Sequence, residues 1–249
     1  MEWLRAQLPL LHPELRFEVF GFEVSDYGTR RETGPPNGVS WISIQDPWPY
    51  PDNFFQVVIS NHVLEHVATP DIFFGELSRT LCVGGFSAHL LPLRHCIWEG
   101  HIHLPFVHWI TNRDLLRSYI TLMSRLGLGR FRDHSAALGV RLPEFAEQHA
   151  DFILHFTRYM NSSDALILAR GRQLGGSYRF TRDLYTRKLR SLLRRGQSYV
   201  YDSHRSAFWD WASFIVLRYV SGVTLFLEKS NRYRHGTEQR VAAGQKLIH

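Results

Sequence analysis

The sequence predicts an α/β protein built on a parallel sheet, because apolar strands alternate with an amphipathic helix over short connections. Residues 57–60 (VVIS) have the β-branched composition of a strand, and residues 86–93 form another apolar run of strand length. Between these runs, Phe73, Leu77 and Leu81 recur at helical spacing on one face. Strand, helix and strand in this order predict a parallel βαβ unit.

The ends of this helix carry recognisable signals. Thr69 is a candidate N-cap, and Pro70 suits the first helical position, where its missing N–H is not needed. Gly84 and Gly85 follow the apolar run, and we expect them to end the helix.

Further elements extend the pattern on both sides. Upstream, we expect a helix over 2–11 and two strands, over 17–24 and 39–44. Downstream, we expect three helices, over 113–126, 142–160 and 182–195, and then a strand over 223–228. We therefore expect a sheet core over residues 1–108, a helical insertion over 109–200, a return to the sheet over 201–230 and a loose tail over 231–249.

The composition is that of a globular protein of 249 residues, with 44% hydrophobic and 21% charged residues. Two cysteines do not make a disulfide framework, and the N-terminus lacks the features of a signal peptide, so the sequence predicts a cytoplasmic protein. The most apolar stretch, 208–227, is interrupted by Asp210 and Arg218, which argues against a membrane span.

The net charge of +6 comes largely from one basic cluster in the second half of the chain. Such a cluster either attracts an anionic partner or forms the solvated face of a helix, and the second interpretation is favoured. No nucleic-acid-binding signature accompanies it, so nucleic acid is not the expected partner. Its members are Arg179, Arg182, Arg187, Lys188, Arg190, Arg194 and Arg195.

One linear series of short elements is specific enough to indicate a family. It consists of Asp46, the turn Pro49-Tyr50-Pro51-Asp52, the strand 57–60, Leu64-Glu65-His66 and Gly84-Gly85. The series resembles the middle of the class I S-adenosylmethionine-dependent methyltransferases, particularly a bacterial group acting on small or sugar-like acceptors. The family usually has Asp where this chain has Gln56, a position that caps structure rather than doing chemistry.

The resemblance implies a Rossmann-like sheet, S-adenosylmethionine as cofactor, and methyl transfer to an oxygen or nitrogen of a small-molecule or saccharide-like acceptor. It also implies cofactor-binding roles for Glu23, Asp46, Asn61 and Glu65. An acid at the carboxyl end of a parallel strand lies where open α/β sheets bind ligands. The alternatives remain that Glu23 is a surface or capping acid, that Asp46 starts a turn, and that Glu65 caps a loop.

Histidines supply the candidate catalytic groups, namely His66, His101 and His103. His66 follows the strand 57–60, and the other two lie in a histidine-rich segment that also holds His95, Glu99 and His108. The alternating spacing in that segment, without an HExxH or paired CxxC pattern, argues against a metal site, and none is predicted. The resemblance implies that this segment lies at the start of the acceptor-binding insertion. There, a histidine could deprotonate a hydroxyl group of the acceptor, and His108 would pack inside the helical lobe.

The resembling fold begins with a strand and a Gly-x-Gly loop, whereas no glycine precedes Gly21 here. We therefore expect a sheet incomplete at its N-terminus. Either the natural protein is longer, or its second strand pairs directly with the fourth and the cofactor site is impaired. A non-catalytic methyltransferase-like binding or partner protein is the alternative function.

Overall fold

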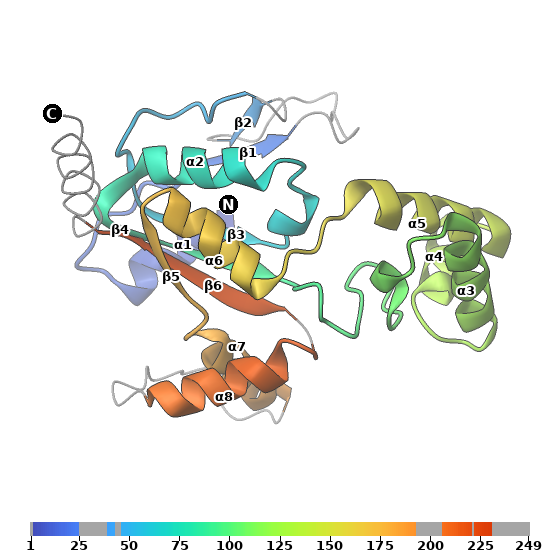
Figure 1. Cartoon of the computed structure of the whole chain (residues 1–249). Coiled ribbons are helices and arrows are strands. Elements are labelled where there is room, and N and C mark those ends of the chain that lie inside the picture. The colour runs from blue at the N-terminus through green and yellow to red at the C-terminus, as the bar shows by residue number, and fades with distance from the viewer. Residues whose placement is uncertain (1, 25–38, 43–45, 193–205, 221, 231–249) are drawn as a thin grey trace, which may run out of the picture.

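The computed structural model describes residues 2–24, 39–42, 46–192, 206–220 and 222–230 (Figure 1). The loop before residue 39, the end of the strand expected to reach residue 44, the last residues of the basic cluster and the expected tail lie outside the described residues.

The larger sheet has four strands in the order β3-β4-β6-β5. β3 (Phe55–Asn61) and β4 (Leu81–Leu91) are parallel, and α2 (Pro70–Thr80) connects them, which confirms the expected βαβ unit. β6 (Val223–Lys229) runs antiparallel to β4 and to β5 (Leu174–Ser177). The mixed sheet with its covering helices confirms the predicted α/β class.

A second, two-stranded sheet pairs β1 (Gly21–Val24) in parallel with β2 (Val39–Ile42). Among the described strands, β1 pairs only with β2, and β3 pairs only with β4. The direct pairing of the second strand with the fourth, left open by the sequence, is therefore not formed. The small sheet is attached through aromatic rings instead: Phe22 packs on Trp48 with ring centroids 4.7 Å apart, and Trp48 meets Phe73 of α2 at 5.4 Å.

The expectation that Gly84 and Gly85 end the helix is wrong. α2 ends at Thr80, and both glycines lie inside β4. They form an irregularity in the pairing with β3, where the register shifts between Phe55 and Val57. Gly84 has a φ of 82°, which L-residues rarely adopt, and a Cβ at Gly85 would lie 2.9 Å from the carbonyl oxygen of Gln56.

Other boundaries differ in length more than in type. The first expected strand is shorter than predicted and spans 21–24. Four helices lie where helices were expected: α1 (Glu2–Leu11), α3 (Arg113–Arg125), α5 (Leu142–Phe156) and α7 (Thr181–Leu192). Four of the described α-helices and strands were not predicted: α4 (Phe131–Leu138), α6 (Ser162–Gly171), β5 and α8 (Ala207–Leu217).

Two hydrophobic cores organise the described chain. The first lies between the four-stranded sheet and helices α2 and α6, and includes Phe74, Leu77, Leu91, Ala165 and Leu225. The second is built from α3, α5 and the segment before them, and includes Ile102, Leu116, Ile120, Phe145 and Ile153. Figure 1 shows α3, α4 and α5 as a helical lobe beside one end of the sheet. The division into domains stays a prediction, although α6 and β5 pack with the sheet and not with this lobe.

Helices α7 and α8 lie together near β6 (Figure 1). Part of the basic cluster forms contacts within the protein: Arg179 pairs with Glu228 at 3.2 Å, and Arg182 lies 3.3 Å from Asp210 of α8. These two ion pairs hold Arg179 and Arg182 against the protein, and the interpretation of the whole cluster as a solvated helix face stays a prediction. None of the described helices is long and apolar enough to cross a membrane.

Gly129 offers a test of how the helical lobe holds its loop beside α4. Its φ is 76°, and an added Cβ would lie 2.8 Å from the carbonyl oxygen of Ile102 and 2.7 Å from Leu104. We expect Gly129→Ala to lower the free energy of unfolding by about 2–4 kcal/mol, since both backbone strain and a backbone clash oppose it. Denaturant titration measures the change.

Gly139 is the matched control, because its φ of 67° is also left-handed but an added Cβ meets nothing within 4 Å. Gly139→Ala should cost only the strain, about 1 kcal/mol. Equal losses in the two variants would contradict the close packing at Gly129.

Candidate active site

The first wall of the site forms where β3 ends. His62 has a φ of 53°, in the left-handed region that histidine tolerates better than branched residues, and this turns the chain into a short 3-10 helix, η2 (Leu64–His66). Glu65 in η2 is buried, and its Oε1 accepts a hydrogen bond from Nδ1 of His62 at 2.9 Å. The backbone N–H of Arg158 donates to the carbonyl of Glu65 at 2.6 Å, which ties η2 to the chain that leaves the helical lobe.

The second wall comes from the segment after β4, and Glu99 organises it. Its side chain is fully buried. Oε2 accepts the backbone N–H groups of His101 and Ile102 at 2.8 Å each, and Oε1 accepts the hydroxyl of Tyr159 at 2.8 Å and a short hydrogen bond from Nδ1 of His101. A buried carboxylate with this many donors is held in one position.

His66 and His101 meet across the two walls, with their Nε2 atoms 3.1 Å apart. Nδ1 of His66 lies 2.8 Å from the carbonyl oxygen of Phe156, which can only accept, so Nδ1 carries the hydrogen. Nδ1 of His101 likewise donates to the Glu99 carboxylate. The structure thus fixes one tautomer of each ring and directs both Nε2 atoms toward each other.

The Glu99–His101 contact alters the acid–base chemistry of both groups. Burial lowers the pKa of His101, but the hydrogen bond and negative charge of Glu99 outweigh it and hold the pKa above its ordinary value of 6.5. Burial of Glu99 acts to raise its pKa, but the hydrogen bonds and charge of His101, with the backbone N–H groups, hold the pKa at about 2. Glu99 is therefore a carboxylate at neutral pH, and His101 is a base stronger than an ordinary histidine.

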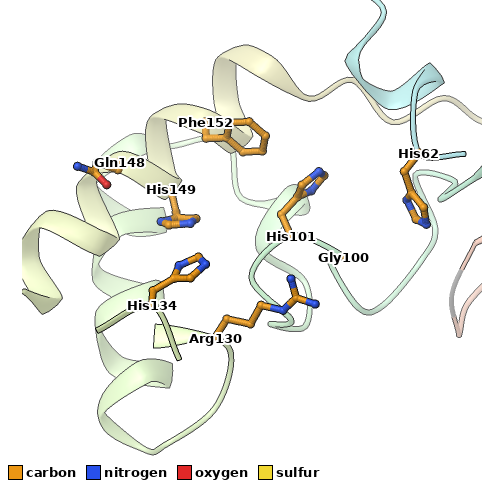
Figure 2. Close-up of a pocket in the computed structure, with 8 residues that line it drawn as sticks. All are labelled: His62, Gly100, His101, Arg130, His134, Gln148, His149 and Phe152. Carbon is orange, nitrogen blue, oxygen red and sulfur yellow. The ribbon is translucent and has the colours of Figure 1, made fainter. Parts of the chain in front are cut away.

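A cavity of about 550 Å³ opens beside this pair. That size is within the usual range for small-molecule sites. Figure 2 shows His62 on one side and the α4 and α5 side chains on the other, with His101 and Arg130 between them. The lining residues are His62, Gly100, His101, Arg130, His134, Gln148, His149 and Phe152.

The helical wall of the cavity is polar and rich in imidazole. His134 of α4 stacks on His149 of α5 with ring centroids 5.3 Å apart, and Nδ1 of His149 donates to the carbonyl oxygen of Phe145 at 2.8 Å. Burial lowers the pKa of His149, which keeps this ring neutral at neutral pH. The backbone N–H of Arg130 donates to the carbonyl of Ile102 at 3.0 Å and so fixes the loop that carries its guanidinium.

Three predicted site residues come together in the structure: Glu65, His66 and His101. His103 does not join them, because its side chain is exposed and does not line the cavity. His108 packs against Tyr159 with ring centroids 4.6 Å apart, and burial lowers its pKa.

The other predicted cofactor residues lie nearer the strands. Glu23 is on β1 opposite Trp41, and its side chain is outside the described part. Asp46 is exposed four residues after β2, and exposed Asn61 ends β3. Their roles toward the cofactor, and that of Glu65, stay predictions.

Several cavity residues were missed by sequence reasoning. They lie far from the histidine-rich segment in sequence, and no local motif marks them: Arg130 directly before α4, His134 in α4, and Gln148, His149 and Phe152 in α5. The one available signal was the recurrence of His134 and His149 in otherwise amphipathic segments, which is weak without the tertiary fold.

Comparison with known proteins supports the same family as the sequence elements. Residues 7–88 match the family model described as "Methyltransferase domain". No curated protein matches the chain by sequence.

Similar solved structures include the complex between the Haloferax volcanii Trm112 methyltransferase activator and a putative methyltransferase, at 13% identity and a TM-score of 0.40, covering 91% of this chain and 79% of that one. A methyltransferase from Mesorhizobium loti has 11% identity, a TM-score of 0.41 and coverages of 89% and 84%. A possible histamine N-methyltransferase from Thermotoga maritima has 12% identity, a TM-score of 0.38 and coverages of 92% and 93%.

These likenesses are too weak to support a structural argument, so the assignment depends on the family match. The matched segment runs from α1 into β4 and includes β1, β2, β3 and the Leu64-Glu65-His66 element. It assigns residues 7–88 to a methyltransferase domain, in agreement with the resemblance of the sequence elements to the class I S-adenosylmethionine-dependent methyltransferases.

Proposed function

We propose that this methyltransferase acts on an oxygen or nitrogen of a small-molecule or saccharide-like acceptor bound in the cavity between His62 and the helical lobe, with His101 as general base. The observation that supports it most directly is the Glu99–His101 pair at the wall of that cavity. A base must lie within hydrogen-bond reach of the proton it removes, and His101 is the cavity histidine whose pKa is raised.

The strands offer suitable chemistry for the cofactor. β1 and β2 are parallel, with Glu23 on the first and Asp46 after the second. Carboxylates at the carboxyl ends of these parallel strands can accept hydrogen bonds from the ribose hydroxyls and the adenine ring of the cofactor. When bound, S-adenosylmethionine supplies the electrophilic methyl group.

In the proposed step, the acceptor oxygen or nitrogen forms a bond to the methyl carbon as the bond from that carbon to sulfur breaks. Nε2 of His101 accepts the proton that the acceptor loses, since its Nδ1 is already held by Glu99, and the proton then lies between the Nε2 atoms of His101 and His66, which are 3.1 Å apart. The buried Glu99 carboxylate then stabilises the imidazolium and keeps the ring in place. Positioning of the acceptor in the cavity contributes the rest of the rate.

The cavity lining favours a polar acceptor. The guanidinium of Arg130, the amide of Gln148 and the imidazoles of His134 and His149 supply hydrogen-bond donors and acceptors, while Phe152 offers one apolar face. Hydroxyl-rich or carboxylate-bearing small molecules match this lining better than extended apolar chains do.

Glu23 tests the cofactor side of the proposal. We expect Glu23→Ala to weaken S-adenosylmethionine binding by about 1.5–3 kcal/mol, the range for hydrogen bonds to a charged group. Isothermal titration calorimetry measures the affinity, and thermal unfolding should change much less than binding does.

Glu18→Ala is the control, because Glu18 is an exposed acid that pairs with its neighbour Arg16 at 3.4 Å. This variant should bind like the wild type. Unchanged cofactor affinity in Glu23→Ala would remove Glu23 from the site. A well-folded wild type that binds no S-adenosylmethionine would favour the non-catalytic alternative.

A further inference from the structure

The contact between His66 and His101 poses a problem of charge. In the neutral form, each ring carries its hydrogen on Nδ1, because the partners there are the Phe156 carbonyl and the Glu99 carboxylate, which only accept. Each Nε2 therefore presents a lone pair, and the two Nε2 atoms are 3.1 Å apart. Two facing lone pairs repel unless a positive charge, either a proton or a metal cation, lies between them.

Glu65 adds a negative charge to the same place. Its side chain is fully buried, and although Oε1 accepts from His62, its Oε2 has no hydrogen-bond partner among the described residues. Ligand atoms of Glu65, His66 and His101 all lie within 4.8 Å of one another. A buried carboxylate oxygen without a donor is costly unless a cation compensates it.

We propose that Glu65, His66 and His101 form a binding site for a divalent transition-metal cation such as Zn²⁺. The sequence argument against a metal considered only the segment around His101, whereas these ligands come from two segments that meet in the fold. Two imidazoles and one carboxylate are a donor set that borderline divalent metals accept, and the site holds too few oxygen ligands for Ca²⁺ or Mg²⁺.

The geometry agrees with this set. Zinc–nitrogen bonds of about 2.0–2.1 Å at tetrahedral angles place two nitrogen ligands about 3.3 Å apart, close to the 3.1 Å between the two Nε2 atoms. The hydrogen bonds at the two Nδ1 atoms also fit a metal site, because metal-binding histidines usually donate the N–H of their other ring nitrogen to a carbonyl or carboxylate. Here Phe156 and Glu99 provide those acceptors.

Three protein ligands leave a coordination position for a water molecule or an acceptor group, and His101 also lines the cavity. A bound cation would occupy the lone pair on Nε2 of His101, so His101 would serve as the base of the proposed function only in the metal-free chain. This consequence depends on the proposed function, whereas cation binding itself does not.

Cobalt titration of the full chain, after treatment with EDTA and removal of the chelator, tests the site. Co²⁺ reports its own coordination through visible absorption bands, and displacement by Zn²⁺ gives the zinc affinity. We expect one Co²⁺ per chain in the wild type. His66→Ala, His101→Ala and Glu65→Gln should each weaken binding by at least about 100-fold, judged against the 10–100-fold cost of losing only an outer contact.

His103→Ala and His134→Ala are the controls, because both histidines lie outside the three-ligand set. Both variants should bind Co²⁺ like the wild type. Glu65→Gln keeps the size of the side chain, and circular dichroism of each metal-free variant checks that it is folded.

If the folded wild type binds no Co²⁺, the positive charge between the two Nε2 atoms is a proton, and the proposal is overturned. So would binding that survives Glu65→Gln and is lost in His134→Ala. A chain that methylates an acceptor without binding metal would refute only the cation site. One that binds metal but transfers no methyl group would refute only the proposed function.

Discussion

Replacing His101 with glutamine should lower turnover by about 10²–10⁴-fold, the usual contribution of a general base, while S-adenosylmethionine binding stays intact. The glutamine amide can still donate a hydrogen bond to Glu99, so the surrounding structure is preserved, but it cannot accept the acceptor's proton. Steady-state kinetics with enzyme kept in EDTA measures the base role in the absence of metal.

His103→Gln is the matched control, since His103 lies two residues away but is exposed and outside the cavity. It should leave turnover unchanged, and a large loss in this variant would transfer the catalytic role to His103. Wild-type activity that disappears in EDTA and returns with zinc would show that the metal, and not a free imidazole, activates the acceptor.

The pH dependence follows from the Glu99 contact. His101 acts as a base in its neutral form, and its pKa is held above 6.5, so kcat/KM should rise with pH through an apparent pKa above that value. Glu99→Gln removes the negative charge that raises the pKa of His101. The rising limb of the profile should therefore move to lower pH in this variant, and an unmoved profile would separate Glu99 from the titrating base.

The sequence predicted the βαβ unit and its neighbours because these elements have strong local signals. Phe73, Leu77 and Leu81 repeat at helical spacing, and Pro70 marks the helix start. The end of α2 was misplaced because glycine is equally consistent with a helix C-terminus and with an irregular strand. Only the pairing of β4 with β3 distinguishes the two.

The site could be predicted only in part for a similar reason. His66 and Glu65 were identified from a short element after a strand, and His101 from a dense group of histidines. Their proximity depends on the packing of the helical lobe against the end of the sheet, where the Phe156 carbonyl and the Arg158 backbone N–H meet η2. Contacts between segments this far apart in the chain leave no periodic trace in the sequence.

Removal of the Glu99 side chain should produce the largest loss of stability. Glu99→Ala leaves the hydroxyl of Tyr159, the backbone N–H groups of His101 and Ile102, and Nδ1 of His101 without their acceptor in a buried region. Losing one partner of a buried charged pair costs about 3–5 kcal/mol. We expect a decrease of that size in the free energy of unfolding, measured by denaturant titration at neutral pH.

Glu147→Ala is the control, because Glu147 also accepts hydrogen bonds, from Arg113 and Arg117, but on the exposed surface of the helical lobe. Exposed ion pairs contribute about 0–1 kcal/mol, so this variant should be nearly as stable as the wild type. Similar losses in the two variants would mean that burial does not set the energy of the Glu99 contacts.

The pH dependence of stability gives an independent check with a definite sign. The pKa of Glu99 is lowered from 4.5 to about 2 in the folded protein, so its ionised form stabilises the fold. That contribution is complete above 4.5, where the unfolded chain is also ionised, and is lost as the pH falls toward 2. The stability difference between the wild type and Glu99→Gln should therefore be largest between pH 4.5 and 6.5, where His101 is also protonated, and shrink between pH 4.5 and 2. A difference that stayed constant over this interval would show that the carboxylate charge contributes nothing, and that hydrogen bonds which glutamine can replace hold His101 in place.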